Sequence, residues 1–333
     1  MKKKLIIQFL EAIAVGDAFG KVTEYCTRQE IKEQLGTVET LLTPQESLTH
    51  KDLSYGQITD DTEQNIYLLR QFCLTGTVTA KQTAQALLDW YKETNATAYI
   101  GPSSARAILA IQSGEDISTT GLWGTTCGGI MRSPAAFLCG VTRQDLIDNT
   151  IACLLPTHNT AAAMEAAICY VFALEAAFAG KDIDQILDAA IEGALLGSGI
   201  GNSLRTAGCV PSCAARITCI REMMPHIKTE EKLQELLYDV LGTTLASADV
   251  CSAVIGTFLW AKDDVFTAIR FATNMGGDSD TIAFLAAGLC CLYAGKHNIP
   301  PYITEQVIKA NNLELEKLAQ DIMKLRKRTE LVL

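Results

Sequence analysis

Apolar residues recur along most of the chain with the three-to-four-residue spacing of an α-helix, and the strict alternation that marks a β-strand is scarce. The first apolar segment runs from Ile6 to Phe19 and is expected to end in a turn that contains Gly16 and Gly20. Further helices are predicted at residues 61–75, 79–93, 103–112, 143–153, 159–179, 183–197, 230–239, 247–260, 263–273, 280–295 and 304–327. This pattern predicts an all-α protein.

The sequence shows no boundary between domains. Its 333 residues could form one large domain or two of average size. We find neither a repeat, a low-complexity segment nor a break in composition, and residues 36–57 have the Gly, Pro and Thr content of an ordered loop. We therefore predict a single compact multi-helix domain over residues 1–333, with residues 304–333 forming a C-terminal helix packed on it.

The composition is that of a protein with a large core and an acidic surface. Hydrophobic residues make up 48% of the chain, and Ala-rich runs at residues 160–163 and 176–179 favour helices that pack through small side chains. The net charge of -10 argues against a nucleic acid or an anionic membrane held by the overall electrostatic field. No stretch of eighteen consecutive apolar residues occurs, so we expect no membrane span.

Twelve cysteines raise the question of disulfide bonds. The lysines at positions 2–4 are soon followed by Gln8 and Glu11, so the long apolar core of a secretion signal is missing. We therefore expect a reducing, cytoplasmic location, in which cysteines mostly act as small apolar residues within helices. Cys209 and Cys213 have C-x3-C spacing but lack a second pair or a nearby histidine, so we expect no zinc site there.

Two short acidic motifs carry most of the candidate chemistry. One is Gly276-Gly277-Asp278-Ser279-Asp280-Thr281, and the other, more than two hundred residues earlier, is Thr59-Asp60-Asp61-Thr62. Each places two carboxylates and a hydroxyl at the start of a predicted helix, and such oxygen donors suit Mg²⁺ or Mn²⁺. Two like charges about 4 Å apart repel by roughly 4 kcal/mol at an effective dielectric near 20. One or two bound dications would remove that repulsion.

Helix capping is an alternative explanation for both motifs. Asp61 and Gln64 have a spacing that resembles a capping box, and acidic residues complement the dipole at a helix N-terminus. Asp278 and Asp280 stand in the same position before their helix, although the two preceding glycines allow the backbone to turn tightly close to a ligand. The spacing alone leaves a shared dinuclear site and simple capping both open.

Four further segments have both a functional and a structural interpretation. Glu24 follows a Gly-bounded turn and is either a third acidic site or a solvated residue near a helix end. Residues 128–132 either contact a ligand or form a turn with an arginine on the surface. His158 is either a phosphate donor or part of a helix cap. The helix start near Gly101 and Ser103 offers free N–H groups that could hold a phosphate, although most such starts hold water.

Taken in order, these motifs resemble those of the ADP-ribosylglycohydrolase family, which includes dinitrogenase-reductase-activating glycohydrolases and ADP-ribosyl-acceptor hydrolases. Five blocks match between Gly16 and about Pro300: Gly-Asp-Ala-Phe-Gly with Glu24 seven residues after its Asp, Thr-Asp-Asp-Thr, Gly-Gly-Ile-Met-Arg, Thr-His, and Gly-Gly-Asp-Ser-Asp-Thr. The resemblance implies an all-α fold around two divalent cations, Mg²⁺ or Mn²⁺. The implied ligands are Thr59, Asp60, Asp61, Asp278, Asp280 and Thr281.

The resemblance also implies residues for the substrate. Glu24 falls where some members place a gating or catalytic carboxylate. The positions that match ADP-ribose-binding segments are Gly101, Ser103, Gly128, Gly129 and His158. Many members have Asn-Gly before the Met-Arg block where this chain has Cys127-Gly128, a departure that affects the expected substrate preference and not the fold.

The implied reaction is the metal-dependent hydrolysis of the glycosidic bond between ADP-ribose and an acceptor. The acceptor is an ADP-ribosylated protein side chain or a small ADP-ribose conjugate, with nucleic acid expected only as a modified substrate. Cleavage builds oxocarbenium character on the ribose, and a carboxylate is needed to activate water or protonate the leaving group. We expect Asp60 to be a ligand and the first candidate for the base, with Glu24 the second candidate. A dinuclear-metal phosphoesterase and a non-catalytic ADP-ribose-binding protein are the alternatives.

Overall fold

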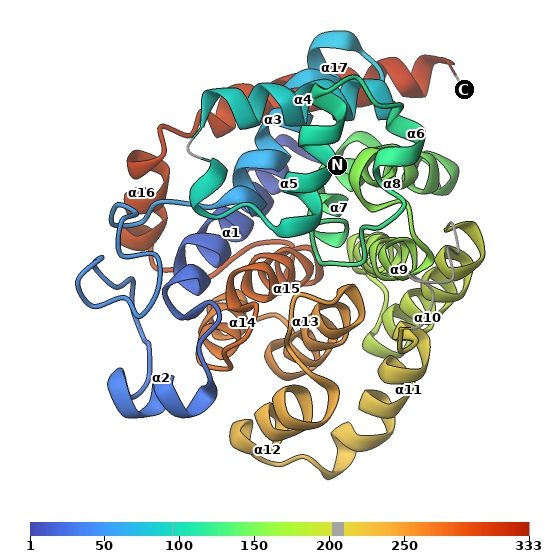
Figure 1. Ribbon diagram of the computed structural model, residues 1–333. Coiled ribbons are helices and arrows are strands. Elements are labelled where there is room, and N and C mark those ends of the chain that lie inside the picture. The colour runs from blue at the N-terminus through green and yellow to red at the C-terminus, as the bar shows by residue number, and fades with distance from the viewer. Residues whose placement is uncertain (95, 202–209, 333) are drawn as a thin grey trace.

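Two apolar helices, α1 (Lys3–Gly20) and α15 (Ser279–Ala294), pack against each other at the centre of the computed structural model, which describes residues 1–94, 96–201 and 210–332 (Figure 1). Gly16 and Gly20 form part of α1 instead of the expected turn. A Cβ atom at Gly16 would lie 2.6 Å from the Ala283 carbonyl oxygen, and one at Gly20 would lie 2.5 Å from that of Ser279. Both glycines are therefore needed for the close approach of the helices, and packing has overridden their low helix propensity.

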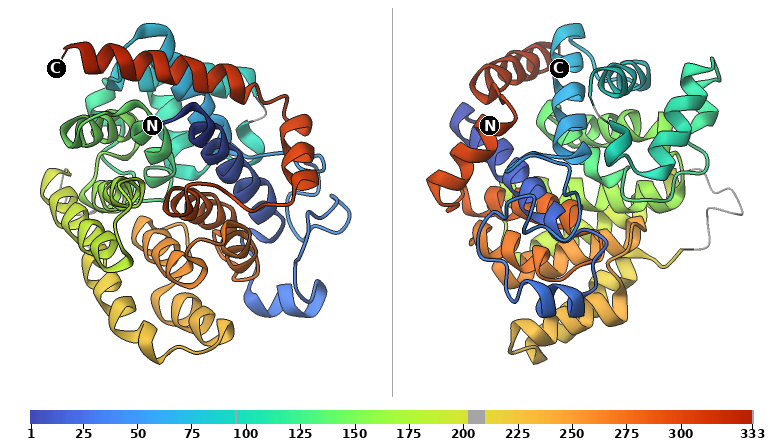
Figure 2. Two further views of the ribbon diagram at one scale, coloured as in Figure 1. Left: turned by 180° about the vertical axis from the view of Figure 1, so that it is seen from behind. Right: turned by 60° about the vertical axis from the view of Figure 1, so that its left-hand side comes forward.

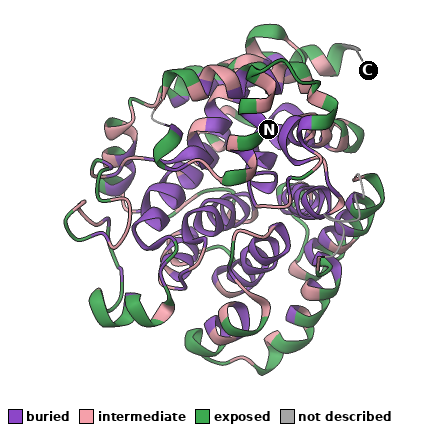
Figure 3. Cartoon of the chain, in the orientation of Figure 1, coloured by how far each residue is buried: buried purple, intermediate pink, exposed green. Residues whose placement is uncertain are grey.

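The remaining core consists of helices that are apolar on nearly every side. Beside α15 lie α9 (Ala161–Phe178) and α13 (Ser247–Ala261), which Figure 3 shows as almost entirely buried. By length and composition α9 could cross a membrane, but 83% of it is buried inside the fold. Packing within the core thus accounts for its apolar residues.

The other helices surround this core. They are α2 (Arg28–Gln34), α3 (Asp60–Thr75), α4 (Ala80–Glu93), α5 (Pro102–Gln112), α6 (Ile117–Thr120), α7 (Ser133–Cys139), α8 (Arg143–His158), α10 (Ile183–Ile200), α11 (Cys213–Met223), α12 (Glu230–Gln234), a π-helix (Glu235–Leu241) that continues α12, α14 (Val265–Thr273), α16 (Pro301–Ala310) and α17 (Leu315–Val332). Within the described residues, β-structure is limited to one isolated bridge between Thr126 and Ala246. The prediction of an all-α fold is confirmed.

Two details of the predicted organisation need correction. The single helix expected at residues 304–327 is divided, because α16 ends at Ala310 and α17 begins only at Leu315. Between them Asn312 has a φ of 50°, which a continuous helix cannot contain. Viewed from behind, α17 lies across α1 and closes that side of the core (Figure 2). The short helices α2, α6, α7 and α11 were not predicted, and Cys209 lies outside the described residues.

Candidate functional site

The N-terminus of α3 is capped by a residue from α1. The buried carboxylate of Asp17 accepts hydrogen bonds from the hydroxyl of Thr59 (2.7 Å) and from the backbone N–H groups of Thr59 (2.9 Å) and Thr62 (3.0 Å). Thr59 makes no side-chain capping bond to α3. Since Asp17 satisfies these donors, Asp60 and Asp61 are not needed as caps, and their carboxylates are free for another role.

The turn before α15 depends on its two glycines. Gly276 and Gly277 have φ values of 80° and 76°, and a Cβ atom at Gly277 would lie 2.2 Å from the carbonyl oxygen of Thr243. The backbone of Gly277 donates to the Cys26 carbonyl, and that of Asp278 donates to Thr243. Asp278 stands at the N-cap position without a side-chain capping bond. Capping therefore explains this motif no better than the first.

The two motifs and Glu24 meet in one buried cluster of carboxylates. Glu24, Asp278 and Asp280 each place an oxygen within 4.8 Å of the other two. The hydroxyl of Thr281 donates a 3.2 Å hydrogen bond to Oδ2 of Asp61. Among the described residues, the buried atoms Asp61 Oδ1 and Asp278 Oδ2 have no hydrogen-bond partner. Unpartnered buried carboxylate oxygens are costly, and a divalent cation is the partner that fits an all-oxygen set.

Burial and mutual repulsion make these groups hold their protons. Burial, followed by the charge of Asp278, raises the pKa of Glu24 to about 8. The pKa of Asp61 rises well above its ordinary value because of burial and then the charge of Asp280. Burial and the charge of Glu24 do the same for Asp60. A cluster of this kind stabilises added positive charge, so the donor chemistry and the electrostatics both fit divalent cations.

A narrow pocket opens over this cluster. Its lining contains the acidic residues Glu24, Asp60, Asp61, Asp278 and Asp280 together with Thr281. The other lining residues are Tyr25, Tyr99, Gly101, Pro102, Ser104, Thr126, Cys127, Gly128, Met131 and Leu245. Its cavity volume of about 20 Å³ has room for about one water, so a ribose would require the lining side chains to move apart. Tyr25, which is 58% exposed, is the most accessible of the large apolar side chains in this lining.

The structure brings only some of the predicted substrate residues to this pocket. Gly101 and Gly128 line it, whereas Ser103 and Gly129 do not belong to its lining. Ser104 lines the pocket instead of its neighbour Ser103, because helix α5 turns adjacent residues to different faces. The family resemblance pointed to segments of which some residues line this pocket, and a role of these residues in binding substrate stays a prediction.

His158 lies behind the pocket lining. Its buried ring bonds to the hydroxyls of Thr126 through Nε2 (3.0 Å) and Thr157 through Nδ1 (2.8 Å). A Cβ atom at Gly128 would lie 2.8 Å from Cε1 of His158, so Gly128 separates the ring from the pocket. Here the ring supports residues 126–128, and a direct phosphate contact stays a prediction.

Arg132 is a fully buried cation beside the acidic cluster. The alternative that placed it on the surface is wrong, because it is 0% exposed. Its guanidinium donates to the side chains of Gln64, Thr157 and Ser104. Burial lowers its pKa to about 10, and the charge of Asp60 acts in the opposite direction. Arg132 thus connects Ser104 of the pocket lining with Gln64, whose side-chain amide donates to Oδ2 of Asp60.

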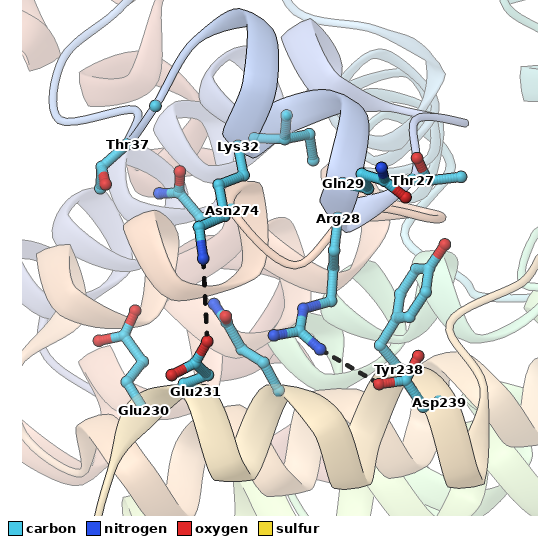
Figure 4. Close-up of a pocket in the computed structure, with 13 residues that line it drawn as sticks. Thr27, Arg28, Gln29, Lys32, Thr37, Glu230, Glu231, Tyr238, Asp239 and Asn274 are labelled. Carbon is cyan, nitrogen blue, oxygen red and sulfur yellow. Dashed lines mark hydrogen bonds and ion pairs between the residues drawn. The ribbon is translucent and has the colours of Figure 1, made fainter.

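A wider cleft between α2 and α12 is a weaker candidate (Figure 4). It has a volume of about 650 Å³, and Figure 4 shows Arg28 and Lys32 of α2 reaching across it. Arg28 pairs with Asp239 (3.2 Å) and Lys32 pairs with Glu231 (3.9 Å). These carboxylates are exposed and already paired, whereas those of the pocket are buried, and among the described residues Asp61 and Asp278 each keep an oxygen without a hydrogen-bond partner. The acidic pocket is therefore the functional site that the structure supports.

Comparisons with known proteins identify the family and the fold. The family model described as ADP-ribosylglycohydrolase matches residues 4–331. The chain is 26% identical to the uncharacterized protein YegU of Escherichia coli (strain K12) over 100% of both chains, and 26% identical to an uncharacterized protein of Archaeoglobus fulgidus over 83% of each. A solved ADP-ribosylglycohydrolase-related protein complex superposes with a TM-score of 0.67 at 20% identity, covering 97% of this chain and 98% of that one. Because the family model spans nearly the whole sequence, the chain belongs to the ADP-ribosylglycohydrolase family.

Proposed function

We propose that the protein hydrolyses the glycosidic bond between ADP-ribose and an acceptor in a reaction that depends on divalent cations. The family is one of hydrolases that act on ADP-ribosylated substrates, and it is typically metal-dependent. The observation that carries the proposal is the meeting of Asp61 and Asp278, each with an unpartnered buried oxygen, with Glu24 and Asp280 beneath one narrow pocket. A protein that only needed to fold would not retain such a cluster at the cost of its burial.

The residues that would hold two cations, Mg²⁺ or Mn²⁺, are Thr59, Asp60, Asp61, Asp278, Asp280 and Thr281. All six are buried and present oxygen atoms alone, the donor type that hard cations prefer. Thr59 already donates its hydroxyl proton to Asp17, which leaves the oxygen lone pairs of Thr59 available. When bound, such cations supply Lewis acidity and offset the charge of the carboxylates.

The chain itself supplies proton transfer and orientation. In the overall reaction the bond from ribose C1″ to the acceptor breaks, a water oxygen takes its place, and a proton passes to the acceptor. Asp60, whose Oδ2 accepts a 3.3 Å hydrogen bond from Gln64, is the proposed base toward that water. Glu24 is the second candidate, because a carboxyl with its pKa raised to about 8 can carry a proton near neutrality.

The proposal is tested by product analysis on a panel of substrates. ADP-ribosylated arginine and serine peptides, an ADP-ribosylated oligonucleotide and O-acetyl-ADP-ribose are each incubated with protein and Mg²⁺ or Mn²⁺, and with EDTA as the control. Release of ADP-ribose from one acceptor class, lost on chelation, is the expected result. Release of AMP or phosphate would identify the phosphoesterase alternative, and tight ADP-ribose binding without turnover would identify a binding protein.

A further inference from the structure

The loop between α2 and α3 is hydrogen-bonded to the residues that precede Glu24. The hydroxyl of Thr49 donates to the carbonyl of Lys21 (2.8 Å), and the backbone of Leu48 donates to the carbonyl of Val22 (3.0 Å). The next residue, His50, has a φ of 50°, a conformation that residues other than glycine seldom adopt. Such a conformation persists only where the surrounding structure enforces it, and it turns the His50 side chain toward Glu24.

His50 makes a direct side-chain contact with Glu24, which lines the acidic pocket. Its Nε2 atom bonds to Oε2 of Glu24, and only 12% of the His50 side chain and 6% of the Glu24 side chain are exposed. Glu24 is also within 4.8 Å of the carboxylate oxygens of Asp278 and Asp280. Glu24 is thus held between an imidazole from the loop and two acids from the turn before α15.

We propose that His50 is a positioning residue that keeps the carboxylate of Glu24 inside the acidic cluster, where Glu24 adds a further oxygen ligand to the six named above. This inference rests on the metal-dependent function proposed above. The neighbouring carboxylates explain why Glu24 needs such a partner. Asp278 and Asp280 repel an ionised Glu24, and a flexible glutamate side chain can relieve that repulsion by rotating toward solvent. The hydrogen bond between Glu24 and His50 opposes this rotation, as partners of metal-ligating carboxylates commonly do.

The chain contains a matched pair that serves as a control. His297 Nε2 bonds to Oε2 of Glu11 at 2.9 Å, with 12% and 20% of the two side chains exposed. Neither residue belongs to the pocket lining. Loss of this second histidine removes a similar contact from a similar environment, so it reports the purely structural cost of such a change.

The first measurement is Mn²⁺ affinity without substrate, followed by the electron paramagnetic resonance signal of free Mn²⁺. His50→Ala is expected to bind Mn²⁺ about 10- to 100-fold more weakly than the wild-type protein, the range typical for partners of metal ligands. His50→Gln, which keeps an N–H donor, should recover most of that affinity, and His297→Ala should match the wild type. If His50→Ala fails to fold, His50→Leu tests the same loss with a side chain of comparable size.

A double-mutant cycle shows whether His50 acts through Glu24. In a Glu24→Gln background, the further change His50→Ala should leave Mn²⁺ affinity within about twofold, because the group that His50 positions has already been altered. Equal fold-losses in both backgrounds would overturn the proposal, as would unchanged affinity in His50→Ala itself. A wild-type protein that binds no Mn²⁺ would overturn this inference and the proposed function together. Normal Mn²⁺ binding with the expected pattern, but no ADP-ribose release, would reject the proposed function alone.

Discussion

The hydroxyl of Thr281 donates a 3.2 Å hydrogen bond to Oδ2 of Asp61, across 220 residues of sequence. This contact joins the two acidic motifs at the N-termini of α15 and α3. Asp61 Oδ1 has no hydrogen-bond partner among the described residues. The contact therefore orients the carboxylate but pairs only one of its two oxygens. The two helix starts therefore form one site, and changes in either motif should have the same consequence.

Replacement of Asp280 by Asn separates metal binding from helix capping. Oδ1 of Asp280 accepts a 2.9 Å bond from the backbone of Thr281, and an amide oxygen can do the same. Asp280→Asn should therefore keep its circular dichroism spectrum while turnover falls by on the order of a hundredfold, since a charged ligand is lost. Asp264→Asn is the control, because Asp264 caps α14 through Thr267 (2.9 Å) and is remote from the pocket. Near wild-type turnover in Asp280→Asn would show that Asp280 has only a local structural role.

The stabilisation by metal should increase with pH. Burial raises the pKa of Glu24 to about 8, and those of Asp61 and Asp278 lie well above their ordinary values. A carboxyl with a raised folded-state pKa contributes stability that is present below its unfolded pKa near 4 and is lost as pH rises through the folded value. The Tm of chelated protein should thus fall between pH 5 and 8.5, and Mg²⁺ at 100 times its Kd should restore about 2.7 kcal/mol. A Tm that changes with pH in the same way with and without metal would contradict this expectation.

The close packing of α1 on α15 can be tested at Gly20. A methyl group there would lie 2.5 Å from the Ser279 carbonyl oxygen and 2.6 Å from Cα of Asp280, both backbone atoms that cannot move independently. Gly20→Ala should destabilise the protein by about 1–3 kcal/mol or more and weaken metal binding by displacing Asp280. Gly199→Ala is the matched control, because a Cβ atom on that helical glycine meets nothing within 4 Å. Urea unfolding should show Gly199→Ala to be neutral or more stable by up to about 1 kcal/mol.

Two roles of His158 can be tested separately, namely the support of residues 126–128 and a direct contact with a phosphate. The buried ring bonds to Thr126 and Thr157, so His158→Ala should lower the free energy of unfolding by about 1–3 kcal/mol while the metal content is unchanged. Exposed His226 provides the control, with an expected change within about 0.5 kcal/mol for His226→Ala. Isothermal titration with ADP-ribose distinguishes the two roles. A large loss of affinity with unchanged stability would indicate the direct phosphate contact predicted from the sequence.

The parts of the site that follow from the sequence are those encoded by local motifs. Asp60, Asp61, Asp278 and Asp280 could be identified because oxygen-rich clusters at helix starts have few chemical uses. The need for the Gly276-Gly277 turn was also readable, since glycine alone adopts positive φ without strain. Where these motifs stood on helices, the helix starts were predicted to within about two residues.

The parts that could not be predicted depend on contacts between distant segments. Gly16 and Gly20 were assigned to a turn because glycine disfavours helices, and only the approach of α15 explains their place within α1. Asp17 stood out in the sequence only as an acidic residue. Its role as the cap of α3 follows from the structure, which brings α1 next to the start of α3. His50 gave no signal at all, because a lone histidine in a loop acquires meaning only when the fold brings it to Glu24.

The packing of the first helix against one near the end of the chain has a consequence for biosynthesis. The hydroxyl of Ser279 donates to the carbonyl of Gly20 (2.9 Å), 259 residues earlier in the chain. At the usual rates of translation, α1 emerges roughly 10 to 50 seconds before its partner is made. During that interval its apolar surface, which includes Phe9 and Ile13, has to be shielded by other means, and the carboxylates cannot yet assemble. The acidic pocket is therefore completed only in the last stage of synthesis, so a chain that ends before α15 lacks both a finished core and the cluster of carboxylates.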